Sequence, residues 1–94
     1  MPVGILNLDL YLPGCTSLKE KRSLVKPLLI RLQREFSLSA AEVDLHDKWQ
    51  SAAITCAIVS NDAIHNQRVL QQVINYIERT WPEIQIIGQN METC

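Results

Sequence analysis

Hydrophobic and polar residues alternate in the first segment of the chain, a pattern typical of a half-buried β-strand. Leucine occupies every second position from Leu6 to Leu12, and Asn7, Asp9 and Tyr11 lie between the leucines. Alternate side chains of a strand point to opposite faces, so the leucines are predicted to face the core. A Pro-Gly pair then signals a turn, and the strand is predicted over residues 3–12.

Hydrophobic residues recur at helical spacing from Ser17 to Phe36. Ser17 and Glu20 form a capping-box pattern, which predicts that the helix begins there. Pro27 lies inside this segment and removes one backbone hydrogen bond. We therefore expect one helix with a bend at Pro27.

A second helical pattern follows Ser60, Asn61 and Asp62 and ends before Pro82. All three residue types are favoured N-caps, so helix capping is the first interpretation of the triplet. The free N–H groups at the start of a helix also attract anions, which the carboxylate of Asp62 would oppose. The sequence leaves open whether this cap binds a ligand.

Three further segments, residues 39–46, 51–60 and 83–89, have patterns of β-strands. Residues 51–60 are apolar and partly β-branched, which predicts a central strand. Residues 39–46 alternate, and their apolar set is predicted to face the core: Ala41, Val43 and Leu45. The uncovered face of the sheet is then predicted to be acidic, with Asn7, Asp9, Tyr11, Glu42, Asp44 and His46.

The elements follow the order β-α-β-β-α-β in a single domain of residues 1–94. Two amphipathic helices can cover only one face of a four-stranded sheet, and right-handed crossovers restrict the order of its strands. We therefore predict an α+β, ferredoxin-like sandwich with a four-stranded antiparallel sheet and both helices on one face.

Composition narrows the class of protein. Hydrophobic residues make up 47% and charged residues 20% of the chain, as in ordinary globular domains. No apolar run approaches the ~18–20 residues of a transmembrane helix, so no membrane association is expected. The three cysteines, Cys15, Cys56 and Cys94, are odd in number and form no CxxC pair, so a zinc site or disulfide framework is not expected. A reducing, cytoplasmic location is predicted, with Cys56 in the core.

Positive charge is concentrated in the first helix. Residues 17–36 carry six basic and two acidic residues, whereas the remainder carries three basic and eight acidic ones. The candidate nucleic-acid-binding residues are Lys19, Lys21, Arg22, Lys26, Arg31 and Arg34. Such a ridge gains affinity for a phosphate backbone by releasing counterions. The alternative interpretation is a solvated surface helix, because Lys and Arg are also good helix formers.

The predicted sheet face argues against the binding mode of RNA-recognition motifs. Those domains share the order β-α-β-β-α-β but stack bases on aromatic residues of the first and third strands. Residues 51–59 contain neither an aromatic nor a basic residue. If RNA binds, we expect it on the helix side.

Polar and aromatic residues gather between the second and third strands: Asp44, His46, Asp47, Trp49 and Gln50. Two carboxylates and one histidine are a loose set of metal ligands compared with known closed sites, so no metal is predicted. A polar hairpin that buries the ring of Trp49 is the preferred interpretation.

No arrangement typical of nucleophilic catalysis is present, and we predict a protein without catalytic activity, cofactor or identified small-molecule substrate. Acylphosphatases have a ferredoxin-like fold and similar length. Their loop carries an arginine that cradles phosphate, and residues 12–17 contain no arginine.

Three stretches, "LPGCTSLKEKRSLVK", "AEVDLHDKWQSAAI" and "IVSNDAIHNQRVLQQV", resemble the YlxP-like family of small bacterial proteins of unknown function. The resemblance implies a ferredoxin-like fold and a translation-related setting, because genes of the family often lie beside those of an initiation factor and a ribosome-assembly factor. It implies no catalytic residue. Pro27 is a departure from many members. The matching motif positions are Ser17, Lys19, Glu20, Lys21, Arg22, Asp47, Trp49, Gln50, Ser60, Asn61 and Asp62.

Two functions therefore stand as hypotheses. The first is a non-enzymatic accessory protein that docks on structured RNA or a ribosomal subunit through its basic first helix, with Trp49 and Gln50 as a second contact. The second is a protein-interaction or regulatory module, dimeric through the sheet face or a strand edge, without a nucleic-acid role. The identity of the partner and the oligomeric state are not encoded in any recognisable motif.

Overall fold

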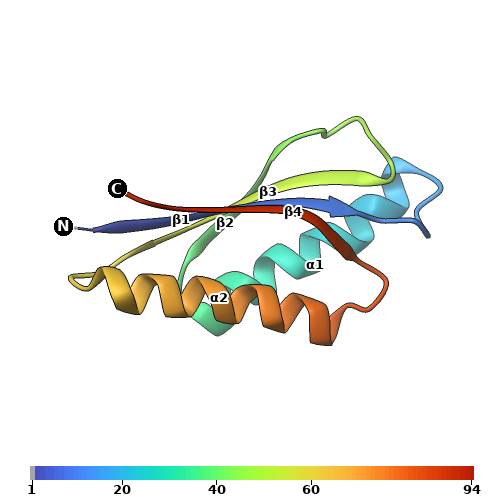
Figure 1. The fold of residues 1–94 in the computed structure, drawn as a ribbon. Coiled ribbons are helices and arrows are strands. Elements are labelled where there is room, and N and C mark those ends of the chain that lie inside the picture. The colour runs from blue at the N-terminus through green and yellow to red at the C-terminus, as the bar shows by residue number, and fades with distance from the viewer. Residues whose placement is uncertain (1) are drawn as a thin grey trace.

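The computed structural model describes residues 2–94 and has two layers, a sheet and a pair of helices packed on one of its faces (Figure 1). The strands are antiparallel, and their spatial order is β2-β3-β1-β4. This arrangement confirms the predicted fold class. The elements are β1 (Val3–Tyr11), α1 (Leu18–Phe36), β2 (Ser39–Asp44), β3 (Ser51–Val59), α2 (Ala63–Thr80) and β4 (Gln85–Thr93).

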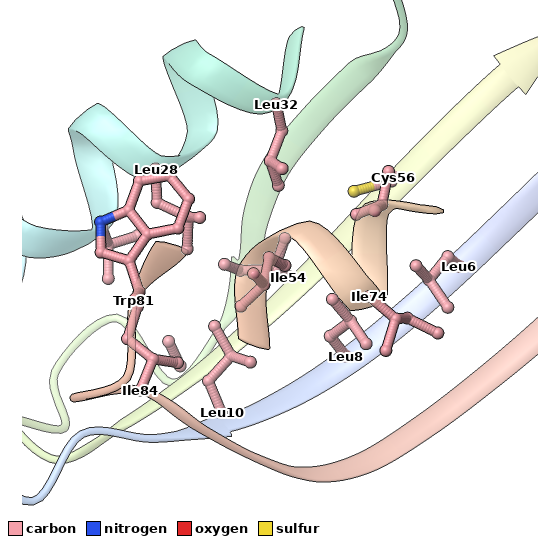
Figure 2. Packing of buried hydrophobic residues seen from close by; sticks show 14 of the residues in the cluster. Leu6, Leu8, Leu10, Leu28, Leu32, Ile54, Cys56, Ile74, Trp81 and Ile84 are labelled. Atoms are coloured by element: carbon pink, nitrogen blue, oxygen red, sulfur yellow. The ribbon is translucent and has the colours of Figure 1, made fainter. Parts of the chain in front are cut away.

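The core lies between the sheet and the helices. Leu6, Leu8, Leu10 and Leu12 are all fully buried, as the alternation in β1 predicts. Figure 2 shows Leu6, Leu8 and Leu10 of β1 converging with residues of β3 and of both helices. Cys56 of β3 belongs to this cluster, and burial raises the pKa of its thiol to about 11. The thiol is therefore a neutral, small apolar group at physiological pH.

Helix α1 begins and continues as the sequence predicts. The Ser17 hydroxyl accepts a hydrogen bond from the Glu20 N–H at 3.1 Å. The Glu20 carboxylate accepts from the backbone N–H and the hydroxyl of Thr16, each at 2.9 Å, one residue earlier than in the usual capping box. The helix runs without interruption through Pro27. A bend at Pro27 stays a prediction.

The Ser60–Asp62 triplet organises the connection from β3 to α2. Asp62 is the N-cap, and its side chain accepts from the N–H groups of Ile64 and His65. The Ser60 hydroxyl donates to Asn66 Oδ1 at 2.7 Å, and Asn66 is fully buried. Asp62 therefore caps the helix and Ser60 holds the connection to it, while Asn61 is exposed.

Strand β4 is longer at its C-terminal end than its hydrophobic pattern predicts. It pairs with β1 from Gln85, opposite Tyr11, to Thr93, opposite Gly4. Backbone pairing at the edge of a sheet does not require apolar side chains, so the polar residues after Ile87 could not reveal this extension.

The predicted faces of β2 are wrong from Ala41 to Val43, whereas Asp44 lies on the uncovered face as predicted, because it pairs with Ala53 on the side of Asp9. Ala40 and Glu42 lie opposite the core residues Cys56 and Ile54 of β3, so they face the helices. The register shifts between Glu42 and Asp44, and Val43 is 54% exposed. Because a one-residue change of register reverses which side chains face the core, the alternation alone assigned this edge strand to the wrong face.

Candidate functional site

The basic residues of α1 lie on the helix surface that faces away from the sheet. Val25, Leu28 and Leu32 occupy the buried side of the helix. Five of the six candidate residues are exposed: Lys19, Arg22, Lys26, Arg31 and Arg34. A shallow groove of about 510 Å³ follows this surface, lined by Lys19, Arg22, Ser23, Lys26, Pro27, Ile30 and Arg31. We call these groove residues together with Arg34 the basic face.

Lys21 does not belong to the basic face, and its prediction as a nucleic-acid contact is wrong. Its side chain is only 2% exposed. The ammonium group lies 2.7 Å from Glu42 Oε2 and donates a hydrogen bond of 2.6 Å to the carbonyl oxygen of Leu45. A buried ammonium requires such a partner, because desolvation of an unpaired charge costs several kcal/mol. Lys21 therefore joins α1 to the end of β2.

The helical spacing contains the signal for this burial. Lys21 precedes Val25 by four residues, and Val25 is followed at helical intervals by Leu28 and Leu32. These four residues share one face of α1, and all four are buried. The prediction grouped Lys21 with its charged neighbours by residue type, and it placed Glu42, the actual partner, on the uncovered face of the sheet.

In the described part of the chain, no carboxylate lies within 4.0 Å of the exposed cations of the basic face. Among residues 2–94, the pair of Lys21 and Glu42 is the one ion pair within 4.0 Å. The guanidinium of Arg31 lies 5.1 Å from the ring centroid of Trp81 and 5.7 Å from that of Tyr76. Cation–π attraction to these rings holds Arg31 in place while leaving it exposed. The positive charge is therefore free to act on an external anion.

The connection between β2 and β3 is a turn stabilised by its own hydrogen bonds. Leu45 has a left-handed backbone conformation, with φ of 62°. Its N–H donates to Asp44 Oδ1 at 2.8 Å, and its carbonyl oxygen accepts from the N–H of Lys48 at 3.0 Å. His46 Nε2 forms a hydrogen bond of 3.0 Å with the carbonyl of Glu42. Two of the three side chains that suggested a metal site, Asp44 and His46, therefore bond to the local backbone.

Gln50, and not Trp49, fastens this connection to the rest of the protein. The side-chain amide of Gln50 donates to the carbonyl oxygens of Pro13 and Cys15, both at 3.4 Å. The backbone carbonyl oxygen of Gln50 accepts from the N–H of Leu12 at 2.9 Å. Trp49 is 54% exposed. The prediction that its ring is buried is therefore wrong: hydrogen bonds, not the ring, close the hairpin.

The exposed ring borders a small hollow of about 380 Å³, lined by Asp47, Lys48, Trp49, Gln50 and Ser51. We call these five residues the Trp49 hollow. It lies close to the start of α1, because Gln50 contacts Cys15 and Lys21 contacts Leu45. Figure 1 shows the start of β3 and the start of α1 at the same end of the molecule.

Titratable groups at the start of α1 are perturbed by their neighbours. The two hydrogen bonds from Thr16 lower the pKa of Glu20. Burial raises the pKa of the Cys15 thiol, the nearby charge of Glu20 raises it further, and Lys21 opposes these effects. Cys15 is therefore a weak nucleophile at neutral pH.

Within residues 2–94, no three His, Cys, Asp or Glu side chains are arranged to hold a metal ion. In the same part of the chain, no helix has the length and apolarity to cross a membrane. The candidate site is the basic face together with the Trp49 hollow.

Comparison with solved structures supports the fold. The structure is similar to that of LFR1 1, a de novo designed protein with ferredoxin fold, with a TM-score of 0.57 and 8% sequence identity. The similarity covers the whole of this chain and 83% of the designed chain. The de novo designed protein Foldit4 is similar over the whole chain and 97% of its own, with a TM-score of 0.56 and 12% identity. At these identities the likeness establishes the ferredoxin-like fold alone.

Comparison of sequences establishes the family. The uncharacterized protein YlxP of Bacillus subtilis (strain 168) is 32% identical over 83 residues, which cover 88% of this chain and 89% of that protein. Residues 3–91 match the model of a family described as protein of unknown function (DUF503). The chain therefore belongs to the DUF503 family, whose description assigns no activity.

Proposed function

We propose that this protein is a non-enzymatic accessory factor that docks on structured RNA, such as that of a ribosomal subunit, through the basic face of α1. One observation carries the proposal: five exposed cations follow one helix surface, and no carboxylate of residues 2–94 lies within ion-pairing distance of them. A cytoplasmic setting is part of the proposal.

The physical basis is the release of counterions from the RNA. Each phosphate neutralised by a Lys or Arg contributes a slope of about −0.7 to −0.9 to the dependence of log affinity on log salt concentration. Engagement of three to five cations of the basic face would therefore give a total slope of about −2 to −4.5. Such binding weakens strongly between low and high salt.

The experiment measures binding to purified ribosomal subunits and to a structured RNA fragment at several salt concentrations. The triple variant Lys19→Ala, Arg22→Ala, Lys26→Ala is expected to weaken binding and to reduce the salt slope by about 2 to 3. Arg22→Ala and Arg68→Ala form a matched pair, because both arginines are exposed but Arg68 lies on α2. Only the α1 variant should change the slope. Binding that is absent, or insensitive to both salt and the triple variant, would refute the proposal.

A second candidate is a protein-interaction module that pairs through the uncovered face of the sheet. No helix covers this face, and Val59 at its border is 58% exposed (Figure 1). Asp9 lies on the same face, in a central strand, and would approach its own copy in a symmetric face-to-face dimer. That repulsion makes this candidate the second choice. Sedimentation of the purified protein, and of a lysate treated with nuclease, distinguishes the two: a protein partner survives nuclease treatment, whereas an RNA partner does not.

A further inference from the structure

We propose that Trp49 is a stacking platform for an unpaired nucleobase, so that the protein selects RNA with single-stranded nucleotides over uninterrupted duplex. The inference rests on the proposed docking of RNA on α1 and adds the class of RNA and a second contact. It begins from the exposure of Trp49, a residue that is 54% exposed on the connection between β2 and β3.

The core does not use this ring. The other tryptophan, Trp81, is 8% exposed and packs edge-on against Tyr76 at a centroid distance of 5.8 Å. Trp49 has no such aromatic neighbour among the described residues. A large aromatic side chain left half in water forgoes the stabilisation that burial would provide, and its surface is available to a partner.

The loop that carries the ring is held on both sides. On one side, Lys21 binds the carbonyl oxygen of Leu45 and pairs with Glu42. On the other, the Gln50 amide binds the carbonyl oxygens of Pro13 and Cys15. Because the backbone on either side of Trp49 is already fixed, a partner need not order the loop when it binds. An exposed ring on a backbone held in this way is suited to stacking.

The Trp49 hollow has no net charge that would attract a phosphate, because one carboxylate, Asp47, and one ammonium group, Lys48, both line it. The Asp47 carboxylate can accept hydrogen bonds from amino groups of a base edge, and the Lys48 ammonium group can donate to a base oxygen or nitrogen. The phosphate-attracting cations lie on the basic face of α1, and the start of this helix is joined to the connection that carries Trp49 by the bonds from Lys21 to Leu45 and from Gln50 to Cys15. One RNA strand can thus place its backbone along α1 and an adjacent base on the ring. Bases inside a duplex are stacked and paired, so only an unpaired nucleotide can occupy the hollow.

The experiment compares two RNAs with the same duplex stem, one blunt-ended and one with a short unpaired overhang. Loss of a base–aromatic stack predicts that Trp49→Ala weakens binding to the overhang RNA by about 5- to 150-fold and leaves binding to the blunt duplex nearly unchanged. Trp49→Phe keeps an aromatic face and should recover most of the affinity. Thermal unfolding of both variants verifies that each remains folded.

Tryptophan fluorescence provides an independent measurement. The sequence has two tryptophans, so Trp49→Phe leaves Trp81 as the reporter. We expect the overhang RNA to quench the emission of the unmodified protein and to leave that of Trp49→Phe unchanged. The blunt duplex should quench neither protein.

The outcomes separate this inference from the proposed function. Stacking is refuted and RNA docking stands if two results are obtained together. The first is that Trp49→Ala weakens the binding of both RNAs equally, or of neither. The second is that the triple variant of Lys19, Arg22 and Lys26 still reduces the salt slope. If no variant changes RNA binding, both proposals are refuted. If Trp49→Ala instead abolishes a complex with a protein that survives nuclease treatment, the ring serves a protein contact and the stacking inference is overturned.

Discussion

Replacement of Lys21 by methionine tests the finding that this lysine is a buried link between α1 and β2. Methionine retains most of the apolar length of the side chain and removes only the charge and its hydrogen bond. Removing one partner of a buried ion pair costs about 3–5 kcal/mol of the free energy of unfolding. The side chain of Glu42 is 17% exposed, so water can partly solvate the carboxylate left behind. We therefore expect Lys21→Met to cost about 3 kcal/mol.

The reciprocal variant should cost more. Glu42→Gln leaves an ammonium group that is 2% exposed, with the carbonyl of Leu45 as its remaining hydrogen-bond partner. We expect a loss of about 4–5 kcal/mol. Replacing both residues with apolar side chains, Lys21→Met with Glu42→Leu, leaves no unpaired charge and should be within about 1 kcal/mol of the unmodified protein.

Urea unfolding of the four proteins, followed by circular dichroism, measures these differences. For a domain of this size, a loss of about 3 kcal/mol corresponds to a Tm lower by about 12–24 °C, so thermal unfolding is a second measurement. Lys26→Met is the matched control, because Lys26 is exposed on the same helix and should change stability by less than about 0.5 kcal/mol. If Lys21→Met behaves like this control, or if the double variant is no more stable than Lys21→Met alone, the buried link is refuted.

Two other predictions follow from local geometry. A Cβ added at Gly4 would lie 3.0–3.2 Å from side-chain atoms of α2 and β3, so Gly4→Ala should lower the free energy of unfolding by about 1–3 kcal/mol. A Cβ added at Gly88 would meet only the side chain of the exposed Asp9, so Gly88→Ala should cost less than about 0.5 kcal/mol. Equal losses of the two variants in urea unfolding would contradict this prediction. The hydrogen bonds from Thr16 lower the pKa of Glu20 below its ordinary value of 4.5. The ionised Glu20 carboxylate therefore stabilises the folded protein at pH values above 4.5, and this stabilisation is lost as the pH falls through the lowered pKa of the folded state. Thr16→Val removes one of the two bonds and should raise the Glu20 pKa in an NMR titration; an unchanged pKa would exclude the hydroxyl as a cause.

The sequence was informative wherever a long periodic pattern met a clear start or stop signal. The leucines of β1, the cap at Ser17 and the cap at Asp62 all occupy the predicted positions. Their cause is local: side chains alternate along a strand, and capping oxygens lie within three residues of the N–H groups they accept from. The order of these elements was then enough to predict the ferredoxin-like fold. Few topologies place both helices on one face of a four-stranded sheet and also keep the crossover connections right-handed.

The candidate site was predictable only in part. The exposure of five basic residues on α1 follows from helical periodicity. Lys21 and Trp49 were each assigned the opposite environment, a charged side chain at the surface and an aromatic one inside. Residue type alone favours both assignments, since lysine is rarely buried without a partner and tryptophan is usually well buried.

What composition and periodicity determined, then, is the set of elements, the apolar core of β1 and the concentration of positive charge on one helix. The tertiary structure alone decided that Glu42 of β2 meets Lys21 of α1, and that Gln50 reaches across to Pro13 and Cys15. These contacts join residues more than twenty positions apart. The pair of Lys21 and Glu42 depends on the register of the edge strand β2, because one step of register reverses both faces of a strand. The Gln50 contacts depend on the pairing of β1 with β3. The burial of Lys21 and the exposure of Trp49 therefore emerge only when the sheet and helices are packed together.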